Sequence, residues 1–266
     1  MTISQQTAQS GTAARVAGSP AWVDLSTKDI DGAKTFYSTL FGWTFEDRGE
    51  EFGHYHYLLR DGQPVGGLMS TVGMTCPEGG ELPTEWGVYL TVPDIEAAAR
   101  AVESTGGRMA VPAMPVGDAG SMGVALDPAG AVIGLWQPGD FAGFESSDAP
   151  GSPVWFESMS QDIDAAIPFY RNVFGWQIHE MPGGWRYVTN GPEASATAGL
   201  CDARGVVADG TGSYWRVYLS TADLDADLAR IPGLGGAVLD GPADSPYGRI
   251  ATIADPQGAT FQLIQS

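Results

Sequence analysis

The hydrophobic pattern first changes from a strand period to a helical period between residues 19 and 46. A short apolar stretch at 21–25 favours a strand. Asp29 then has the residue type of a helix N-cap, and Gly42 stands where a residue without Cβ is favoured after a helix. Between them, apolar side chains recur on one helical face: Ala33, Phe36, Tyr37 and Leu40. The pattern therefore predicts a strand and then a helix that begins at Asp29 and ends before Gly42.

The same pattern continues with strands and then repeats in a second unit. Residues 54–59 and 65–70 have the composition of strands, and they flank the turn sequence Asp61-Gly62. In the second unit the pattern predicts a strand at 86–92, a helix at 94–104 and two further strands at 121–126 and 132–137. The stretches 73–80 and 112–123 contain Met and Pro, and we expect them to be loops over cavity mouths. Each unit is interpreted as βαβββ, and these segments locate its helix and three of its strands.

An internal repeat sets the domain organisation. Residues 19–46 match 152–180, residues 85–107 match 214–236, and residues 127–137 match 255–265. Four βαβββ units in an α+β fold with mixed curved sheets follow from this repeat. We expect a flexible tail at 1–18, a first domain at 19–138, a linker at 139–151 rich in Gly, Ser and Pro, and a second domain at 152–266.

The repeated motifs resemble those of the vicinal oxygen chelate superfamily, which includes glyoxalase I, bleomycin-resistance proteins, extradiol dioxygenases and epimerases. Both halves carry a strand followed by DIDxAxxFYxxxFGW, and both close with DPxGxxxxLxQ or its near match. The resemblance implies that paired units curl into half-barrels, each with a ligand cavity. The sequence leaves open which units pair. In glyoxalase-type dimers each cavity takes one unit from each half, and in that arrangement unit one would pair with unit four and unit two with unit three.

The resemblance also implies positions for the ligands of a divalent metal, usually His, Gln or Glu. These positions lie seven residues before the Asp that opens each helix and seven residues after the Asp of DPxG. They hold Trp22, Gly87, Trp155, Arg216, Gly134 and Gln262. Trp and Gly offer no side-chain ligand and Arg is a permanent cation, so Gln262 alone is a weak candidate. We therefore expect neither a metal nor another cofactor.

Two histidines offer a different metal candidate. His54 and His56 are two residues apart in a predicted strand, which would place both side chains on one face. One strand supplies only two ligands, and the matching strand of the second half has Gly184 and Arg186 instead. Ordinary surface or cavity-lining histidines are the favoured interpretation.

Strand alternation extends the metal positions into two predicted cavity walls. The ligand-binding candidates are Trp22, Tyr89, Trp136, Trp155, Met159, Arg216, Tyr218 and Gln262. Asp24 and Glu157 occupy equivalent positions and are candidate general bases or hydrogen-bond acceptors for a ligand, since a partly buried carboxyl group without a partner has a raised pKa. The alternative is a structural role, for instance a pair between Asp24 and Arg216 or between Glu157 and a tyrosine hydroxyl. The tryptophans are either ligand-stacking walls or core residues.

Composition and charge limit the classes of binding partner that the chain is expected to have. Acidic residues outnumber basic ones 32 to 13, for a net charge of -19, and no basic cluster is present. This balance excludes nucleic acid and anionic lipid as expected partners. No apolar stretch approaches transmembrane length, and Cys76 and Cys201 fit no metal spacing. We expect a cytoplasmic monomer or homodimer with two reduced thiols and a small-molecule ligand.

Two classes of function remain. The first is metal-independent binding of a small aromatic or hydrophobic metabolite, for resistance by sequestration or as an accessory in metabolite tailoring. The second is an enzyme: a glyoxalase-like lyase or isomerase, another oxidoreductase of the superfamily, or a metal-free acid–base catalyst that uses Asp24 or Glu157 with Tyr89 or Tyr218. A purely structural or interaction module fits a cavity-forming fold less well.

Overall fold

The computed structural model describes residues 15–76, 79–145 and 147–266. Most of the predicted tail therefore lies outside the described residues. Its last part contacts the body of the protein: Arg15 Nη1 donates to the Pro20 carbonyl over 2.6 Å, and the Gly18 N–H donates to the Thr91 carbonyl over 2.8 Å. In the part of the chain that the structure describes, no helix is long and apolar enough to cross a membrane.

The first half forms one mixed sheet of eight strands in the order β2-β3-β4-β1-β5-β8-β7-β6. Its elements are β1 (Pro20–Thr27), α1 (Ile30–Phe41), β2 (Thr44–Asp47), η1 (Glu50–Phe52), β3 (His56–Arg60), β4 (Gln63–Ser70), β5 (Glu85–Thr91), α2 (Ile95–Ser104), β6 (Arg108–Val116), β7 (Gly120–Leu126) and β8 (Val132–Pro138).

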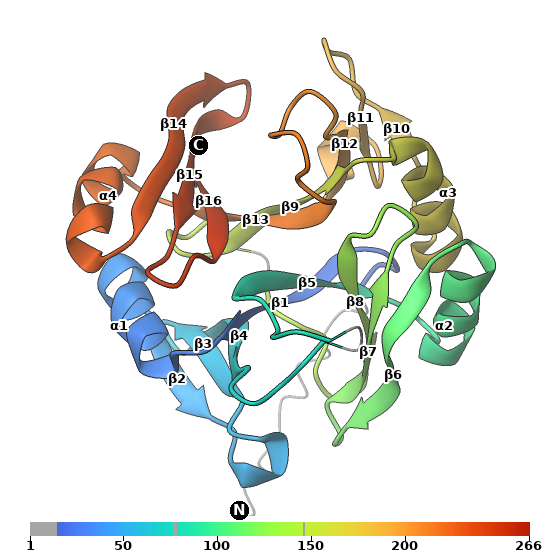
Figure 1. The fold of residues 1–266 in the computed structure, drawn as a ribbon, viewed down its shortest axis with the longest axis horizontal. Coiled ribbons are helices and arrows are strands. Elements are labelled where there is room, and N and C mark those ends of the chain that lie inside the picture. The colour runs from blue at the N-terminus through green and yellow to red at the C-terminus, as the bar shows by residue number, and fades with distance from the viewer. Residues whose placement is uncertain (1–14, 77–78, 146) are drawn as a thin grey trace, which may run out of the picture.

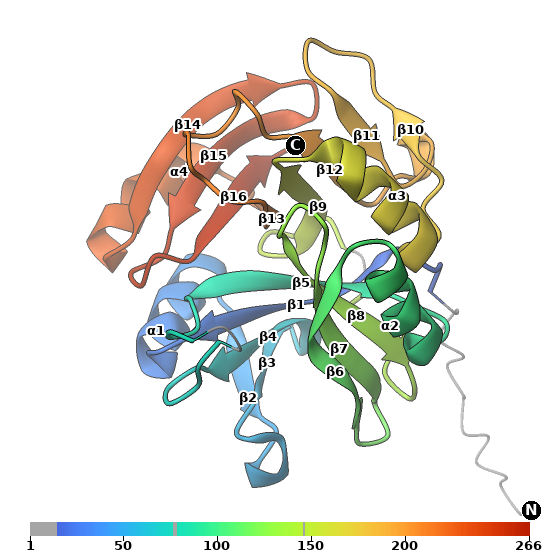
Figure 2. The same ribbon diagram turned by 45° about the vertical axis from the view of Figure 1, so that its right-hand side comes forward.

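The second half repeats this topology in the order β10-β11-β12-β9-β13-β16-β15-β14 (Figure 1). Its elements are β9 (Pro153–Ser160), α3 (Ile163–Phe174), β10 (His179–Glu180), β11 (Tyr187–Thr189), η2 (Glu193–Ser195), β12 (Gly199–Asp202), β13 (Tyr214–Ser220), α4 (Leu224–Arg230), η3 (Ile231–Leu234), β14 (Ala237–Ser245), β15 (Gly248–Ala254) and β16 (Thr260–Gln265). The two curved sheets stack back to back, with α1 and α4 side by side at one end of the seam between them and α2 and α3 at the other (Figures 1 and 2). The predicted α+β fold of repeated βαβββ units is confirmed.

The structure decides the pairing of units, which the sequence left open: units one and four do not share a sheet, and neither do units two and three. Strand β1 pairs with β5 of the next unit, and β9 pairs with β13. Each sheet is therefore built from two consecutive units of one half. Sequential strands and units usually lie next to one another because a short connection reaches the nearest free edge. The likeness to a two-chain enzyme pointed to exchange between halves, and the hydrophobic pattern alone could not decide the matter.

Local signals position the helices as predicted. The Asp29 carboxylate accepts from the Gly32 N–H over 2.9 Å, and Asp94 accepts from the Ala97 N–H over the same distance. Gly42 follows α1 with a φ of 71°, in the left-handed region that favours glycine. The caps at Asp162 and Asp223 are built in the same way. The start of each helix is thus set by its own short sequence.

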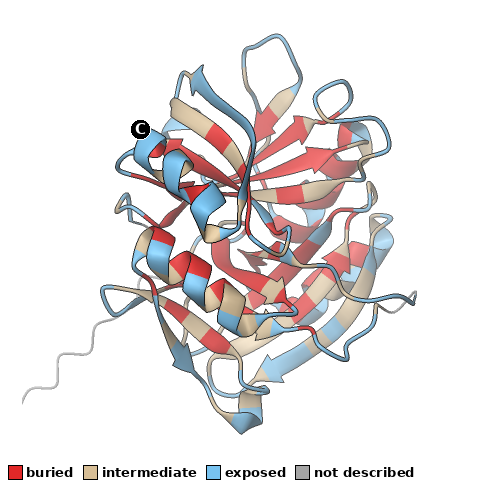
Figure 3. Cartoon of the chain, turned by 60° about the vertical axis from the view of Figure 1, so that its left-hand side comes forward, coloured by how far each residue is buried: buried red, intermediate tan, exposed pale blue. Residues whose placement is uncertain are grey.

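The repeated motifs join the two halves. Tyr37 of α1 donates to the Asp255 carboxylate of the other half over 3.2 Å, and Tyr170 of α3 donates to Asp127 over 3.0 Å. All four residues are buried. The phenyl ring of Phe36 also lies 6.5 Å from that of Phe261, centroid to centroid. The FY motif of each half therefore contacts the DPxG motif of the other half. Figure 3 shows that buried positions run along both sheets and the inner sides of the helices.

The stretch 112–123 is mostly strand, contrary to the predicted loop. Strand β6 is an edge strand, and its register with β7 shifts twice between Met109 and Met114. Pro112 and Pro115 are tolerated there because proline occurs on edge strands and at bulges. Two prolines in one stretch made the sequence look like a loop.

Candidate functional site

The strand register brings the predicted site residues together within each half. On the first sheet Trp22 lies opposite Tyr89, and Asp24 lies opposite Gly87. Tyr89 in turn lies beside Gly134, one strand further along. On the second sheet the equivalent pairs are Trp155 with Tyr218, Glu157 with Arg216, and Tyr218 with Gln262. The candidates thus divide between two walls according to the half of the chain: Arg216, Tyr218 and Gln262 lie with Trp155 and Glu157, and Tyr89 and Trp136 lie with Trp22 and Asp24. They would have been divided otherwise if each cavity took one unit from each half.

The first site is a series of hydrogen bonds that joins Trp22, Tyr55, Asp24 and Tyr89, and we call it a carboxylate row. The Asp24 carboxyl group is buried, and the Tyr55 hydroxyl donates to its Oδ2 over 3.4 Å. Tyr89 also forms a hydrogen bond with it, and Tyr55 itself accepts from Trp22 Nε1 over 2.6 Å. Burial raises the pKa of Asp24 to about 7, although the two tyrosine hydrogen bonds lower it in part. Asp24 therefore changes its protonation state near neutral pH.

The second site repeats this row around Glu157. Tyr218 donates its hydroxyl to Glu157 Oε1 over 2.7 Å, and Tyr187 also bonds the carboxylate. Tyr187 accepts from Trp155 Nε1 over 3.0 Å, as Tyr55 does from Trp22. The tyrosine–carboxylate contact that we considered as a structural alternative is present. Tyr55 and Tyr187 have matching contacts, since each hydroxyl accepts from the indole of its half and lies against Gly67 or Gly199. Neither tyrosine was a sequence candidate.

Arg216 distinguishes the second site from the first. Its Nη1 lies 3.4 Å from Glu157 Oε1, and its Nη2 donates to the Tyr214 hydroxyl over 2.9 Å. Burial lowers the pKa of Arg216, but Glu157 and Tyr214 raise it more, so it stays a cation. The structure pairs Arg216 with Glu157 rather than with Asp24, so the expected alternative pair is wrong. Because 22% of its side chain is exposed, Arg216 can still reach a ligand oxygen.

The metal positions of the family do not suit a metal in this chain. A Cβ on Gly134 would lie 2.1 Å from the Tyr89 ring, and a Cβ on Gly87 would lie 2.8 Å from Asp24 Oδ1. The space that a ligand side chain would need is therefore filled by these two groups. In the second half Gln262 Oε1 accepts from Thr252 Oγ1 over 2.9 Å. No group of three His, Cys, Asp or Glu among the described residues is arranged to hold a metal ion.

The histidine pair does not form a metal site either. His54 precedes strand β3, has a φ of 56°, and its Nδ1 lies 2.9 Å from the Asp47 carboxylate. His56 is buried in β3, and its Nε2 lies 2.9 Å from Lys34 Nζ. The predicted shared face is wrong because the turn at His54 ends the alternation.

Residues of the predicted linker cover part of the first site. The Phe141 ring lies edge-on to Trp22 with centroids 5.0 Å apart, and it stacks on Tyr57 with centroids 5.7 Å apart. Its carbonyl accepts from Trp136 Nε1 over 3.1 Å. Phe144 follows and is almost fully buried. Glycine and serine made this segment look like a plain connection, and its two phenylalanines were the available signal.

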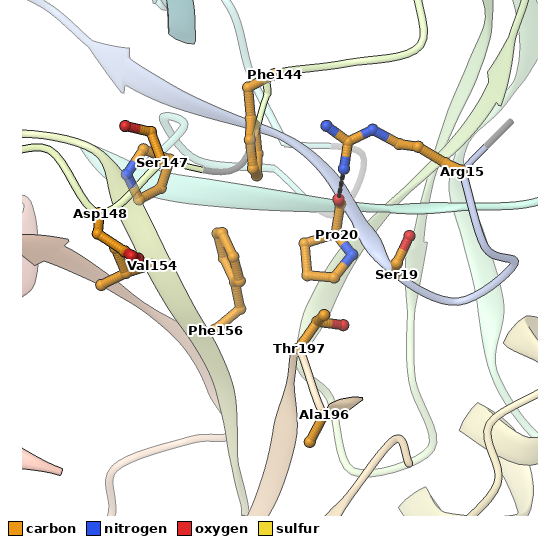
Figure 4. Close-up of a pocket in the computed structure, with 11 residues that line it drawn as sticks. Arg15, Ser19, Pro20, Phe144, Ser147, Asp148, Val154, Phe156, Ala196 and Thr197 are labelled. Atoms are coloured by element: carbon orange, nitrogen blue, oxygen red, sulfur yellow. Dashed lines mark hydrogen bonds between the residues drawn. The ribbon is translucent and has the colours of Figure 1, made fainter. Parts of the chain in front are cut away.

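The remaining candidate borders the second site, whereas the two clefts lie elsewhere. Met159 is buried in a small cluster with Cys201 and Ala203, and this cluster packs against Tyr187 of the Glu157 row and against Tyr214. A cleft between the two halves is lined by Arg15, Phe144 and Phe156, among others, and Figure 4 shows the Arg15 side chain hydrogen-bonded to Pro20 at its edge. A second cleft lies between α1 and α4. Neither of these two clefts is lined by a residue of the carboxylate rows.

The fold and the motifs agree with comparisons against known proteins. Residues 19–135 and 153–263 match the Glyoxalase/Bleomycin resistance protein/Dioxygenase superfamily, and the chain belongs to this family. The Mn(II)-bound glyoxalase from Novosphingobium aromaticivorans superposes with a TM-score of 0.63 at 15% identity, covering 94% of this chain and 82% of that one. The 2,3-dioxygenase LapB from Pseudomonas sp. KL28 gives 0.64 at 12% identity, covering 95% and 94%. At such identities the likeness concerns the fold.

Curated relatives are more similar in sequence. CFP32 of Mycobacterium tuberculosis (strain CDC 1551 / Oshkosh), provisionally named a glyoxylase, is 34% identical over 93% of this chain and 95% of its own. The anthracycline biosynthesis protein DauV of Streptomyces sp. (strain C5) is 32% identical over 93% of both chains. Both relatives match across the two halves.

Proposed function

We propose that this protein binds a flat, polycyclic aromatic metabolite that carries carbonyl or phenol oxygens, and that binding needs no divalent metal. The observation that carries the proposal is the replacement of the family's metal positions. In the first half, Tyr89 and the Asp24 carboxyl group fill the space beside Gly134 and Gly87. In the second half, the Arg216 cation stands at a metal position and contacts Glu157.

The chemistry of the two rows supports an aromatic ligand. Each row combines an indole ring with tyrosine hydroxyl groups and one carboxyl group. Aromatic faces suit a flat apolar ring, and a few fixed polar groups orient its oxygens. Two relatives, DauV and DnrV, are named for anthracycline biosynthesis. Such a protein would sequester the metabolite or hold it during tailoring.

A fluorescence titration tests the metal independence. The chain has eight tryptophans, so an anthracycline aglycone added to metal-stripped protein should quench their emission saturably. Adding back Mn(II), Fe(II), Ni(II) or Zn(II) should leave the dissociation constant unchanged. Binding that disappears with a chelator and returns with one of these metals would contradict the proposal. A non-fluorescent aliphatic ketone of similar size serves as the control ligand.

An enzymatic role is the second candidate, and the Asp24 site favours it. A carboxyl group with a pKa of about 7 between two tyrosine hydroxyls can accept or donate a proton at neutral pH. A glyoxalase-like lyase or isomerase activity would then depend on Asp24 or Glu157. D24N and E157Q should abolish turnover of a converted ligand while leaving its binding constant within about threefold, because acid–base groups contribute mainly to the transition state. Turnover that survives both changes would rule out this mechanism.

A further inference from the structure

The two concave sheet faces are not equivalent, although the register matches them residue by residue. Asp24 and Glu157 lie at the same position, and so do Trp22 and Trp155. Strand pairing also makes Tyr57 equivalent to Thr189, because these residues lie opposite Gly67 and Gly199. The large side chains of the first half are thus replaced by smaller ones at some positions of the second.

The first face already holds an aromatic ring. Phe141 packs against Trp22, Tyr57 and Trp136, with ring centroids between 5.0 and 6.2 Å away. Its backbone is tied down as well, since its N–H donates to the Ala119 carbonyl over 3.1 Å. Trp22 is consequently only 7% exposed. Phe141 takes the place that the flat ring of a ligand would need at this end of the sheet.

The second face lacks these contacts in the part of the chain that the structure describes. Tyr57 and Trp136 are replaced by Thr189 and Ile264, which are smaller. Among the described residues no ring stacks on Trp155, whose Nε1 donates to the Tyr187 hydroxyl, and Trp155 is partly exposed. Arg216, at the position of Gly87, adds a partly exposed cation. On this face, therefore, an indole ring without a stacked partner and a partly exposed cation occur together.

We infer that the second half carries the ligand site, where Arg216 binds an anionic or enolic oxygen of an aromatic ligand that lies over Trp155. In the first half, the Phe141 side chain fills the corresponding space. This inference rests on the proposed function and deepens it. The ligand class is a planar polycycle with an acidic oxygen at one edge, bound once per chain. An arginine with an accessible edge favours such an oxygen through charge-assisted hydrogen bonds.

Calorimetry with anthraquinone-2-sulfonate, a soluble flat quinone with one anionic group, tests the anchor. The wild-type chain should bind one equivalent, and R216Q should weaken binding by about tenfold or more, as the loss of a charge-assisted hydrogen bond implies. For the neutral 2-hydroxymethyl analogue, R216Q should cause a smaller loss of affinity. The matched control is R249Q: Arg249 pairs with Asp225 of α4 on the helix-covered side, and its loss should change affinity less than twofold. Two equivalents per chain, or equal losses in R216Q and R249Q, would overturn the inference.

A second measurement decides the asymmetry without any ligand. Acrylamide quenches exposed indoles, so it is applied in a W185F background that removes an exposed tryptophan. Adding W155F should remove a quenchable component, whereas adding W22F should not, and F141A should make Trp22 quenchable. Equal behaviour of W22F and W155F would overturn the asymmetry. If the quinone does not bind while the quenching result stands, the proposed function fails and the asymmetry of the two faces holds.

Discussion

Asp24→Asn is a direct perturbation of the first carboxylate row. The side chain of Asp24 is buried, pairs with no cation among the described residues, and has a pKa of about 7 in place of the ordinary 3.8. The native state thus retains a proton that the unfolded chain releases. The stabilising contribution of this group is complete below the unfolded pKa and is lost as the pH rises towards 7. The asparagine variant lacks this pH dependence.

The magnitude follows from the linkage relation. Each pKa unit corresponds to about 1.4 kcal/mol, and between about pH 5.5 and 8.5 the native carboxyl group releases its proton while the unfolded one stays ionised. Wild-type stability should therefore fall by about 2 kcal/mol relative to D24N across this interval. Taking the difference between two pH values removes every pH-independent effect of the amide, including altered hydrogen bonds with Tyr55 and Tyr89.

Urea unfolding at both pH values, followed by tryptophan fluorescence, measures this difference. The control variant is D225N, because the hydrogen bond with Arg249 lowers the pKa of Asp225 and so places its titration below the interval. Its stability difference from wild type should be the same at both pH values. If D24N also shows a constant difference, or becomes relatively less stable at high pH, the buried uncharged state of Asp24 is refuted.

Three further predictions concern packing and the thiols. Tyr37→Phe should cost about 1–3 kcal/mol in urea unfolding, because buried Asp255 and Trp86 each lose a partner, whereas Y247F at an exposed hydroxyl should cost less than about 0.5. Gly134→Ala should cost about 1–3 kcal/mol by displacing the Tyr89 ring, and Gly212→Ala, with open space around it, should be neutral in the same assay. Iodoacetamide at about pH 8 should label Cys76 well before Cys201, because burial raises the pKa of Cys201 to about 12; equal mass-spectrometric labelling rates would contradict this.

The sequence was most informative where structure depends on neighbouring residues. Aspartate caps, the glycine after each first helix and the period of the strands all act over a few positions, and these predictions were confirmed at Asp29, Asp94 and Gly42. The internal repeat then allowed the elements predicted for the first half to be assigned to the second half. The alternation also placed Trp22 and Asp24 on the same sheet face, as the register shows.

Features that depend on distant contacts could not be derived in this way. Which units share a sheet is a choice between alternatives with the same hydrophobic pattern. Tyr55 and Tyr187 become part of the carboxylate rows only because Gly67 and Gly199 leave room for their hydroxyls on a neighbouring strand. Phe141 lies in a segment whose composition resembles a linker, and its place against Trp22 follows from tertiary packing alone.

The central claim is that the residues at the family's metal positions now bind an aromatic ligand without a metal. Its most direct test is the metal content of the complex. The protein is produced in medium supplemented with manganese, iron, nickel and zinc, saturated with an anthracycline aglycone, freed of excess ligand and analysed by inductively coupled plasma mass spectrometry. The account predicts a stoichiometric ligand with divalent metal at background level. A stoichiometric metal ion per chain, with ligand released when a chelator removes it, would contradict the account.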